Sequence, residues 1–323
     1  MQKKVTLIIM AIVIFGLTGW VFFLSHKIKK QEAQVLAQEN MQKKYPLLSK
    51  RIFATNPNDI VINFIPLREA LNEYVGKQED KVGVYFEYLP SGISIGVNDR
   101  EEVKLASLSK VPLVMSIFKK IEQGKLSLND ILVVKKENLD QEFGTLWEKG
   151  EGTNLSVEEL VRLSLAESDN TAYYTLSDQL TGQEIDEVYK NLDIPMNQEE
   201  KDSKVYPLVS PKNYSSIFRS LYLSSFLSEE NSNRILEILT KTAFKDKIPA
   251  GVPENISIAH KVGVFAQEDT SQDVFIDCGI VYVPERPYIL CVFVLDTDKK
   301  AQEHIALISK MVYSYLTRVK GEN

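Results

Sequence analysis

A serine and a lysine three positions apart are the first candidates for chemistry in this chain. Ser107 and Lys110 belong to the string Ser-Leu-Ser-Lys, which leads into an apolar run, VPLVMSIF. Positions i and i+3 share one face of a helix, so the lysine amine is expected beside the serine hydroxyl. The helix start adds free N–H groups and partial positive charge where an oxyanion would form. Burial disfavours the charged ammonium and so keeps part of Lys110 neutral, able to accept a proton. We therefore predict nucleophilic catalysis by Ser107 with Lys110 as its base.

The residues that other catalytic arrangements need are scarce. Of the three histidines, His26 adjoins a long apolar run, His304 falls in a predicted terminal helix, and His260 directly precedes Lys261. Neighbouring residues on a strand point to opposite faces, so a Ser-His-Asp triad is hard to assemble. The sequence has no H-E-x-x-H or C-x-x-C string and no His and Cys cluster at zinc spacing. We therefore predict neither a metal site nor a cofactor.

A Ser-x-x-Lys spacing is weak evidence alone, because the chain contains a second one. Ser116 and Lys119 match it as well, in the same predicted helix. Nine residues separate Ser116 from Ser107, which is about half a turn out of phase at 3.6 residues per turn. We interpret Ser116 as structural.

Two further strings strengthen the interpretation. Ser168-Asp169-Asn170 occurs once, and Lys261-Val262-Gly263 follows it in a predicted strand. Taken singly, the first is compatible with a helix cap and the second with a solvated strand lysine. Together with Ser107 and Lys110, in this order and on these elements, they predict one catalytic site.

The elements that would position these residues follow from hydrophobic periodicity. Helices are predicted over residues 65–77 and 302–319, and strands over 82–89, 92–97, 257–265, 274–283 and 288–295. From residue 107 to about 247 the pattern is helical. This order predicts an α/β fold in which an antiparallel sheet, packed by N- and C-terminal helices, is interrupted by an inserted all-α lobe.

The N-terminal segment predicts a membrane anchor. From Val5 to Leu24 the chain carries 20 uncharged residues, the length that a helix needs to cross a bilayer. A cleaved signal usually has a shorter apolar core and a small-x-small site, so we expect a single-pass transmembrane helix. The predicted domains are an anchor over residues 1–26, a helical stalk or linker over 27–50 and a catalytic domain over 51–323.

Composition limits the partners. The sequence has 44% hydrophobic residues, 25% charged residues and a net charge of −6. The chain beyond the predicted anchor is therefore typical of a soluble enzyme and lacks the cationic footprint of a nucleic-acid-binding protein.

The two cysteines, Cys278 and Cys291, fall on neighbouring predicted strands. A turn at residues 284–287 would set Cys278 opposite Phe293, with the thiols diagonal at about 7–8 Å. That distance predicts buried free thiols.

The three strings resemble the active-site elements of class A β-lactamases and penicillin-binding proteins, and the similarity extends over most of residues 65–320. The resemblance implies a five-stranded antiparallel sheet with the helical lobe at a cleft. It also implies that Ser107 attacks an amide or lactam carbonyl, that Lys110 takes its proton, and that Ser168 relays a proton to the leaving nitrogen. No nucleic acid is expected as a partner.

The same resemblance implies roles for the remaining residues. Asn170 would hold Lys110 or the substrate amide, Lys261 would supply positive charge, and Gly263 would let the substrate approach the backbone. The N–H groups of Ser107 and Val264 would form the oxyanion hole.

Two departures from the family pattern limit the expected activity. Efficient class A enzymes carry a glutamate in an E-x-x-L-N loop, and no such string lies between Asn170 and Lys261. Glu199 and Glu200 lie near that place without matching the motif, so we assign neither as the base. Val262 stands where the family has a hydroxyl that helps to bind a substrate carboxylate.

These features predict a membrane-anchored serine hydrolase that forms an acyl-enzyme with β-lactams or related peptides, with slow release. The alternative is a catalytically weak relative that binds cell-wall peptide or a protein partner. A positive-inside count of the flanking lysines would place the domain in the cytoplasm. The natural targets of the chemistry lie outside, so we expect a cell-membrane protein with an extracytoplasmic catalytic domain.

Overall fold

The fold is described from a computed structural model, which covers residues 29, 47, 62–78, 82–195, 197–201, 204–266 and 273–318, with the backbone alone for 197–201 and 204–207. The predicted anchor, from Val5 to Leu24, and nearly all of the predicted stalk lie outside these residues. Within them, no helix combines the length and the apolar character that crossing a membrane requires.

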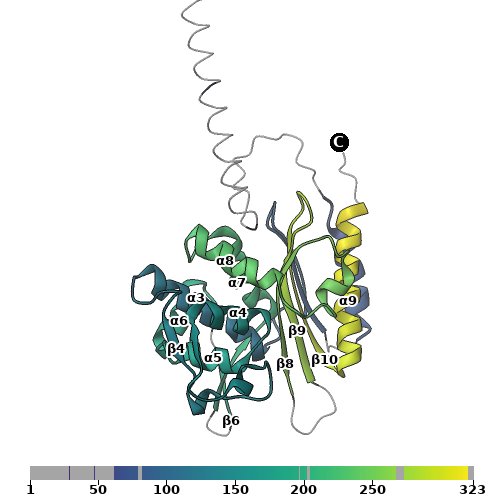
Figure 1. The fold of residues 1–323 in the computed structure, drawn as a ribbon. Coiled ribbons are helices and arrows are strands. Elements are labelled where there is room, and N and C mark those ends of the chain that lie inside the picture. The colour runs from purple at the N-terminus through teal and green to yellow at the C-terminus, as the bar shows by residue number, and fades with distance from the viewer. Residues whose placement is uncertain are drawn as a thin grey trace, which may run out of the picture. The chain divides into compact units, whose positions relative to one another are not determined.

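A five-stranded antiparallel sheet forms the centre of the unit that spans residues 47–323. Its strand order is β2-β1-β10-β9-β8, which leaves β8 at one edge (Figure 1). The strands are β1 (Val82–Tyr88), β2 (Ile93–Val97), β8 (Ile258–Phe265), β9 (Asp273–Val281) and β10 (Tyr288–Asp296). All five predicted strands are present, because runs rich in Val, Ile, Tyr and Phe favour a pleated strand. Of these strands, β1, β9 and β10 are buried along nearly their whole length, whereas β2 is mostly exposed.

The first and last described helices cover one face of this sheet. They are α2 (Ile65–Gly76) and α9 (Asp298–Arg318), and Figure 1 shows α9 lying along the sheet. Leu71 and Ile308 from these helices are fully buried against Phe86 and Val292 of the sheet. Each such side chain contributes about 1.5–3 kcal/mol through burial, so this apolar layer stabilises the packing of the two helices on the sheet.

The chain between β2 and β8 forms a second lobe, which packs against the other face. Its helices are α3 (Lys110–Glu122), α4 (Val157–Ala166), α5 (Asn170–Ser177), α6 (Gly182–Asn191), α7 (Pro211–Leu223) and α8 (Glu229–Thr240), with 3-10 turns η1 (Ala106–Ser109), η2 (Lys136–Asn138) and η3 (Leu146–Lys149). The turn η4 (Ile248–Gly251), which precedes β8, lies instead against α9. Every residue of α3 from Lys110 to Phe118 is buried. Helix α7 lies against β1, β9 and β10, and α8 lies against β8.

The prediction that this lobe is all-α is wrong. Two small antiparallel sheets contribute to it, one of β3 (Val103–Lys104), β7 (Lys204–Val209) and β6 (Asn197–Lys201), the other of β4 (Ile131–Val133) and β5 (Asn154–Ser156). Strands of two or three residues are too short to show a period of two. The β6 sequence, NQEEK, is built from residues with low β-propensity, so pairing rather than local preference makes it a strand.

The prediction of free thiols is also wrong. Cys278 and Cys291 are direct partners in the β9–β10 ladder and are joined by a disulfide. Val281 pairs with Tyr288, so the ladder stops two residues before the predicted turn and the whole register shifts. Since the pairing register decides which side chains face each other, the shift converts a diagonal pair of thiols into a facing pair.

Candidate active site

Ser107 and Lys110 meet as their spacing predicts. The Nζ of Lys110 donates a hydrogen bond to the Oγ of Ser107 at 2.8 Å. Ser107 lies in the 3-10 turn η1 rather than in the α-helix itself, and Lys110 is the first residue of α3. Ala106, directly before the serine, has a left-handed backbone with φ of 47°. Such a conformation is costly for a residue with a Cβ, so the surrounding packing must hold the turn in place.

The lysine is enclosed by the lobe. Lys110 is 3% exposed, its Nζ donates to the Oδ1 of Asn170 at 2.6 Å, and the ring centroid of Tyr173 lies 5.5 Å away. Burial lowers the pKa of Lys110 from 10.5 to about 8, although the negative charges of Asp169 and Asp140 oppose this. The lowered pKa raises the fraction of neutral amine near neutral pH, and the neutral amine is the form that can act as a base.

Ser168 and its two successors occupy the connection between α4 and α5. Ser168 is 2% exposed and has a φ of 58°. Asp169 caps α5 by accepting a hydrogen bond from the N–H of Ala172, and its second oxygen accepts one from Leu146 at 2.9 Å. A Cβ at Gly144 would overlap the Asp169 carboxylate, and this glycine has a φ of +87°. Asp169 is therefore a structural anchor for the loop, while Ser168 and Asn170 face the site.

A second serine–lysine pair lies beside the first. Lys261 of β8 donates from its Nζ to the Oγ of Ser168 at 2.8 Å. Lys261 is 1% exposed, and burial together with the charge of Lys110 pushes its pKa well below the ordinary lysine value. The ring centroid of Phe244 lies 5.8 Å from this amine. The sequence strings predicted this convergence of two hydroxyls and two amines.

Gly263 lets β8 approach the turn that carries the nucleophile. A Cβ at this position would lie 2.7 Å from Cδ1 of Leu108 and 3.2 Å from the carbonyl oxygen of Leu105. Ser107 lies in the turn η1, and Val264 follows Gly263 on β8. The two N–H groups predicted to form the oxyanion hole therefore come from two segments that lie next to each other. The turn is also held from α7, where the Tyr214 hydroxyl donates to the carbonyl of Leu108 at 2.7 Å.

The opposite face of β8 carries a separate polar pair. The Nδ1 of His260 lies 2.8 Å from Oδ1 of Asp277, and both side chains are fully buried. The second carboxylate oxygen of Asp277 accepts a hydrogen bond from Ile248. Val262 is the direct partner of Asp277 and is 5% exposed. Strand alternation thus separates His260 from the serine–lysine pairs, as predicted.

Sequence reasoning missed Asp140. Its Oδ1 accepts a hydrogen bond from the Nδ2 of Asn170 at 2.9 Å, and its N–H donates to Thr171 at 3.0 Å. Asp140 lies in a loop 30 residues before Asn170, with no motif around it, so no signal in the sequence could have identified it. The two glutamates considered near the missing E-x-x-L-N loop, Glu199 and Glu200, are placed in β6, where they pair with Tyr206 and Val205.

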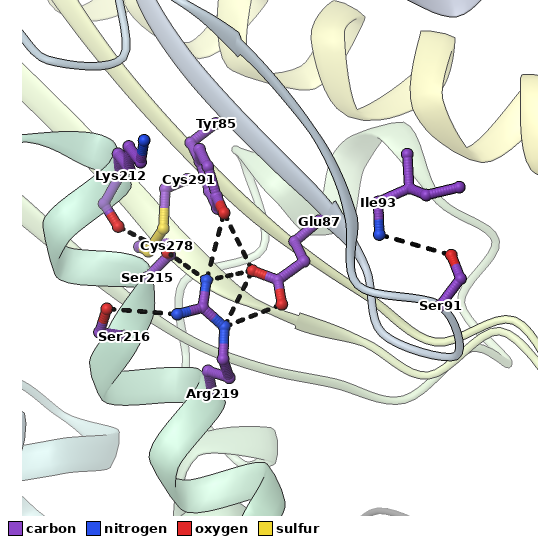
Figure 2. A network of polar contacts seen from close by, with 10 residues as sticks. All are labelled: Tyr85, Glu87, Ser91, Ile93, Lys212, Ser215, Ser216, Arg219, Cys278 and Cys291. Atoms are coloured by element: carbon purple, nitrogen blue, oxygen red, sulfur yellow. Dashed lines mark hydrogen bonds and ion pairs between the residues drawn. A yellow bond between two sulfur atoms is a disulfide. The ribbon is translucent and has the colours of Figure 1, made fainter. Parts of the chain in front are cut away.

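A charged network supports the sheet behind the site. Figure 2 shows Arg219 of α7 pointing at Glu87 and Tyr85 of β1. The Nε of Arg219 donates to Oε1 of Glu87 at 2.8 Å, its Nη2 pairs with Oε2, and the Tyr85 hydroxyl donates to the same carboxylate at 3.0 Å.

A line of directly paired residues across four strands connects Lys261 of the site to Tyr85 of the charged network. Lys261 pairs with Cys278, Cys278 with Cys291, and Cys291 with Tyr85. The disulfide therefore lies between the site lysine and the charged network.

The fold and the two serine–lysine pairs define a serine hydrolase of the β-lactamase type. The beta-lactamase enzyme family matches residues 66–316, and the chain belongs to this family. The extended-spectrum beta-lactamase PER-1 of Pseudomonas aeruginosa is 24% identical over 230 residues, which covers 67% of this chain and 75% of that enzyme. A beta-lactamase of Rhodobacter capsulatus is 28% identical over 188 residues, covering 52% of this chain and 62% of that enzyme.

Solved structures give the same relationship. An acyl-enzyme complex of a PBP-A variant with penicillin G superposes with a TM-score of 0.71 at 26% identity, covering 79% of this chain and 97% of that one. The extended-spectrum beta-lactamase TLA-3 superposes with a TM-score of 0.73 at 20% identity, covering 79% of this chain and all of that one, which supports the fold.

Proposed function

We propose that this protein is an acyl-transferring hydrolase that opens β-lactams or related amides through an acyl-enzyme on Ser107. The observation that carries the proposal is the convergence of two serine–lysine pairs, each with an N–O distance of 2.8 Å. One pair would supply the nucleophile with its base, and the other would supply a proton path on the opposite wall.

The first step follows from the contacts of Lys110. In its neutral form this lysine would accept the Ser107 proton as Oγ attacks the carbonyl carbon. The N–H groups of Ser107 and Val264 would stabilise the negative charge that develops on the carbonyl oxygen. Each such donor is worth about 2.7–4 kcal/mol in comparable sites.

The second step needs a proton at the leaving nitrogen. As the carbon–nitrogen bond breaks, Ser168 would donate its hydroxyl proton to that nitrogen and regain one from its lysine partner. Before it gives up that proton, the charged form of Lys261 would favour an anionic substrate group. Asn170 would hold Lys110 through its amide oxygen and offer its amide N–H to the substrate.

Release of the acyl group would be the slow step. The sequence lacks the E-x-x-L-N glutamate, and loss of a positioned general base typically costs about 10²–10⁴ in rate. The protein would then accumulate acyl-enzyme rather than turn over rapidly.

We also propose that the catalytic domain lies outside the cytoplasmic membrane, held by the apolar run from Val5 to Leu24. The disulfide between Cys278 and Cys291 supports this placement, because such bonds persist mainly in oxidising compartments.

Labelled penicillin tests the proposed chemistry. The full-length protein, purified in detergent, is incubated with penicillin and weighed intact. We expect a gain of one whole penicillin, since ring opening loses no atoms, and no gain in Ser107→Ala. Ser116→Ala is the matched control, because Ser116 lies in the second Ser-x-x-Lys string and hydrogen-bonds to the carbonyls of Pro112 and Glu184.

Two results would overturn this function. If no adduct forms, or if the adduct survives in Ser107→Ala, the alternative of a domain that only binds cell-wall peptide or a protein partner is favoured. Where an adduct does form, its rate of decay separates a hydrolase from a trap.

A further inference from the structure

The amide of Asn170 lies between the amine of Lys110 and the carboxylate of Asp140. Its Oδ1 accepts the hydrogen bond from Lys110 at 2.6 Å, and its Nδ2 donates to Oδ1 of Asp140 at 2.9 Å. An amide nitrogen carries two hydrogens, so one N–H of Asn170 remains for a ligand. A carbonyl bound there would lie next to the Asp140 carboxylate.

Asp140 is the carboxylate that a ligand can reach. Asp169, the other acid whose charge acts on Lys110, is fully buried and caps α5. Asp140 is partly exposed, and its Oδ1 also accepts a hydrogen bond from the N–H of Glu142 at 2.9 Å. Its Oδ2 makes no hydrogen bond to any residue that the structure describes.

The sign of this charge is opposite to that of the rest of the site. Lys110 and Lys261 place two amines on one wall, and in their charged forms these amines suit the electron-rich side of an acyl donor. The Oδ2 of Asp140, next to Asn170, suits an acyl donor that carries a positive charge near its amide carbonyl. An acyl side chain with an amine on the carbon next to that carbonyl would meet both requirements.

We propose that Asp140 is a specificity-determining residue that favours acyl donors with an ammonium group on the carbon next to the carbonyl bound by Asn170. The inference rests on the proposed function, since it names the substrate class of the same site. A hydrogen bond to a charged group in a partly exposed site would give about a 5–20-fold preference.

Two penicillins that differ by this one group provide the test. Ampicillin is penicillin G with an amine on the carbon next to the side-chain carbonyl. The second-order acylation rate constant of each is measured with the full-length protein, at a pH at which the amine is protonated. The quantity compared is the rate constant for ampicillin divided by that for penicillin G. We expect this ratio to be about 5–20 times higher in the parent protein than in Asp140→Asn.

The ratio of the two rates isolates recognition from other effects. Removing the Asp140 charge also changes the pKa of Lys110, but that change affects both penicillins equally and cancels in the ratio. Glu142→Gln is the matched control, because Glu142 is an exposed acid two residues away. Its ratio should stay within about twofold of the parent value.

The parent protein gives a second readout that needs no variant. Its preference for ampicillin should disappear as the pH rises and the amine loses its proton, which a purely structural role for Asp140 would not produce. Equal rates at low pH in the parent, or an unchanged ratio in Asp140→Asn, would overturn the inference while leaving the acylation chemistry intact. Failure of both penicillins to react would instead overturn the proposed function.

Discussion

Lys261 on the edge strand β8 donates a hydrogen bond to Ser168, which belongs to the helical lobe. The 2.8 Å contact therefore joins the two halves of the fold at the site itself. Residues 93 positions apart in the chain supply its two partners, so the site exists only when the sheet and the lobe are packed together.

Replacing Lys261 should remove acylation without unfolding the protein. Lys261→Met keeps the aliphatic stem and removes the amine, so Ser168 loses its proton source. We expect the acylation rate constant for penicillin to fall by at least about 10², measured by mass spectrometry over time. Lys241→Met, at an exposed lysine, should leave the rate within about twofold. A rate in Lys261→Met within threefold of the parent would show that the amine is dispensable.

Acylation should rise with pH through the pKa of Lys110. Because burial places this pKa at about 8, the neutral fraction grows from about a tenth at pH 7 to about nine-tenths at pH 9. The acylation rate constant should increase about tenfold over that interval and then level off. A flat profile measured by stopped-flow kinetics would exclude Lys110 as the base.

The same shift has a consequence for stability. The folded-state pKa is below the unfolded value of 10.5, so the unfolded chain binds more protons between about pH 8 and 10.5. The contribution of Lys110 to the free energy of unfolding is therefore least favourable below pH 8 and improves as the pH rises through that window.

The Arg219–Glu87 pair should be strongly coupled. Glu87 is 6% exposed, so Arg219→Met leaves a buried carboxylate without its cation, and we expect the free energy of unfolding to fall by about 3 kcal/mol. Changing both residues to Met should recover much of that loss, as measured by urea denaturation. Arg162→Met, which breaks only exposed pairs with Glu159 and Glu167, should cost less than about 1 kcal/mol. Additive losses would contradict the coupling.

The disulfide should be present in the native protein and should stabilise it. Replacing both Cys278 and Cys291 by Ala should lower the free energy of unfolding by about 3 kcal/mol, since the bond closes a loop across 13 positions. Denatured, unreduced protein should not react with a maleimide. Two reactive thiols in that experiment would show that the bond does not form.

Val262→Thr should improve the reaction with β-lactams that carry a carboxylate. A hydroxyl bonded to a charged group is worth about 1.5–3 kcal/mol, or roughly 10–100-fold. Val262 lies on the face of the edge strand β8 that carries Asp277, opposite to Lys261, so the gain requires the substrate carboxylate to reach around this edge. Unchanged acylation kinetics would mean that this position does not govern carboxylate recognition.

The sequence predicted most of the fold because its strands are long and strongly patterned. The five sheet strands and α2 were found almost to their ends, and the serine and lysine strings identified both pairs of the site. Register was not predictable in the same way. A ladder that stops at Val281 instead of Val283 changes the partner of Cys278 from Phe293 to Cys291, and no periodicity encodes where a ladder stops.

Residues outside motifs were beyond the reach of sequence reasoning. Asp140 touches Asn170 only because the loop before η3 folds back onto α5, where Asn170 donates its N–H to the carbonyl of Phe143. The β6 strand was missed because its pairing with β7, and not its own residues, makes it extended.

Ala106 and Ser168 each hold a left-handed backbone although neither is a glycine. One directly precedes the nucleophile, and the other carries the second hydroxyl. A residue with a Cβ loses of order 1–3 kcal/mol in such a conformation. Glycine at Ala106 would relieve this strain while loosening the turn that holds the nucleophile, and glycine at Ser168 would relieve it only by removing the second hydroxyl. At these two positions, selection for heat resistance would therefore favour relief of the backbone strain, whereas selection for fast acylation would favour keeping the strained residues.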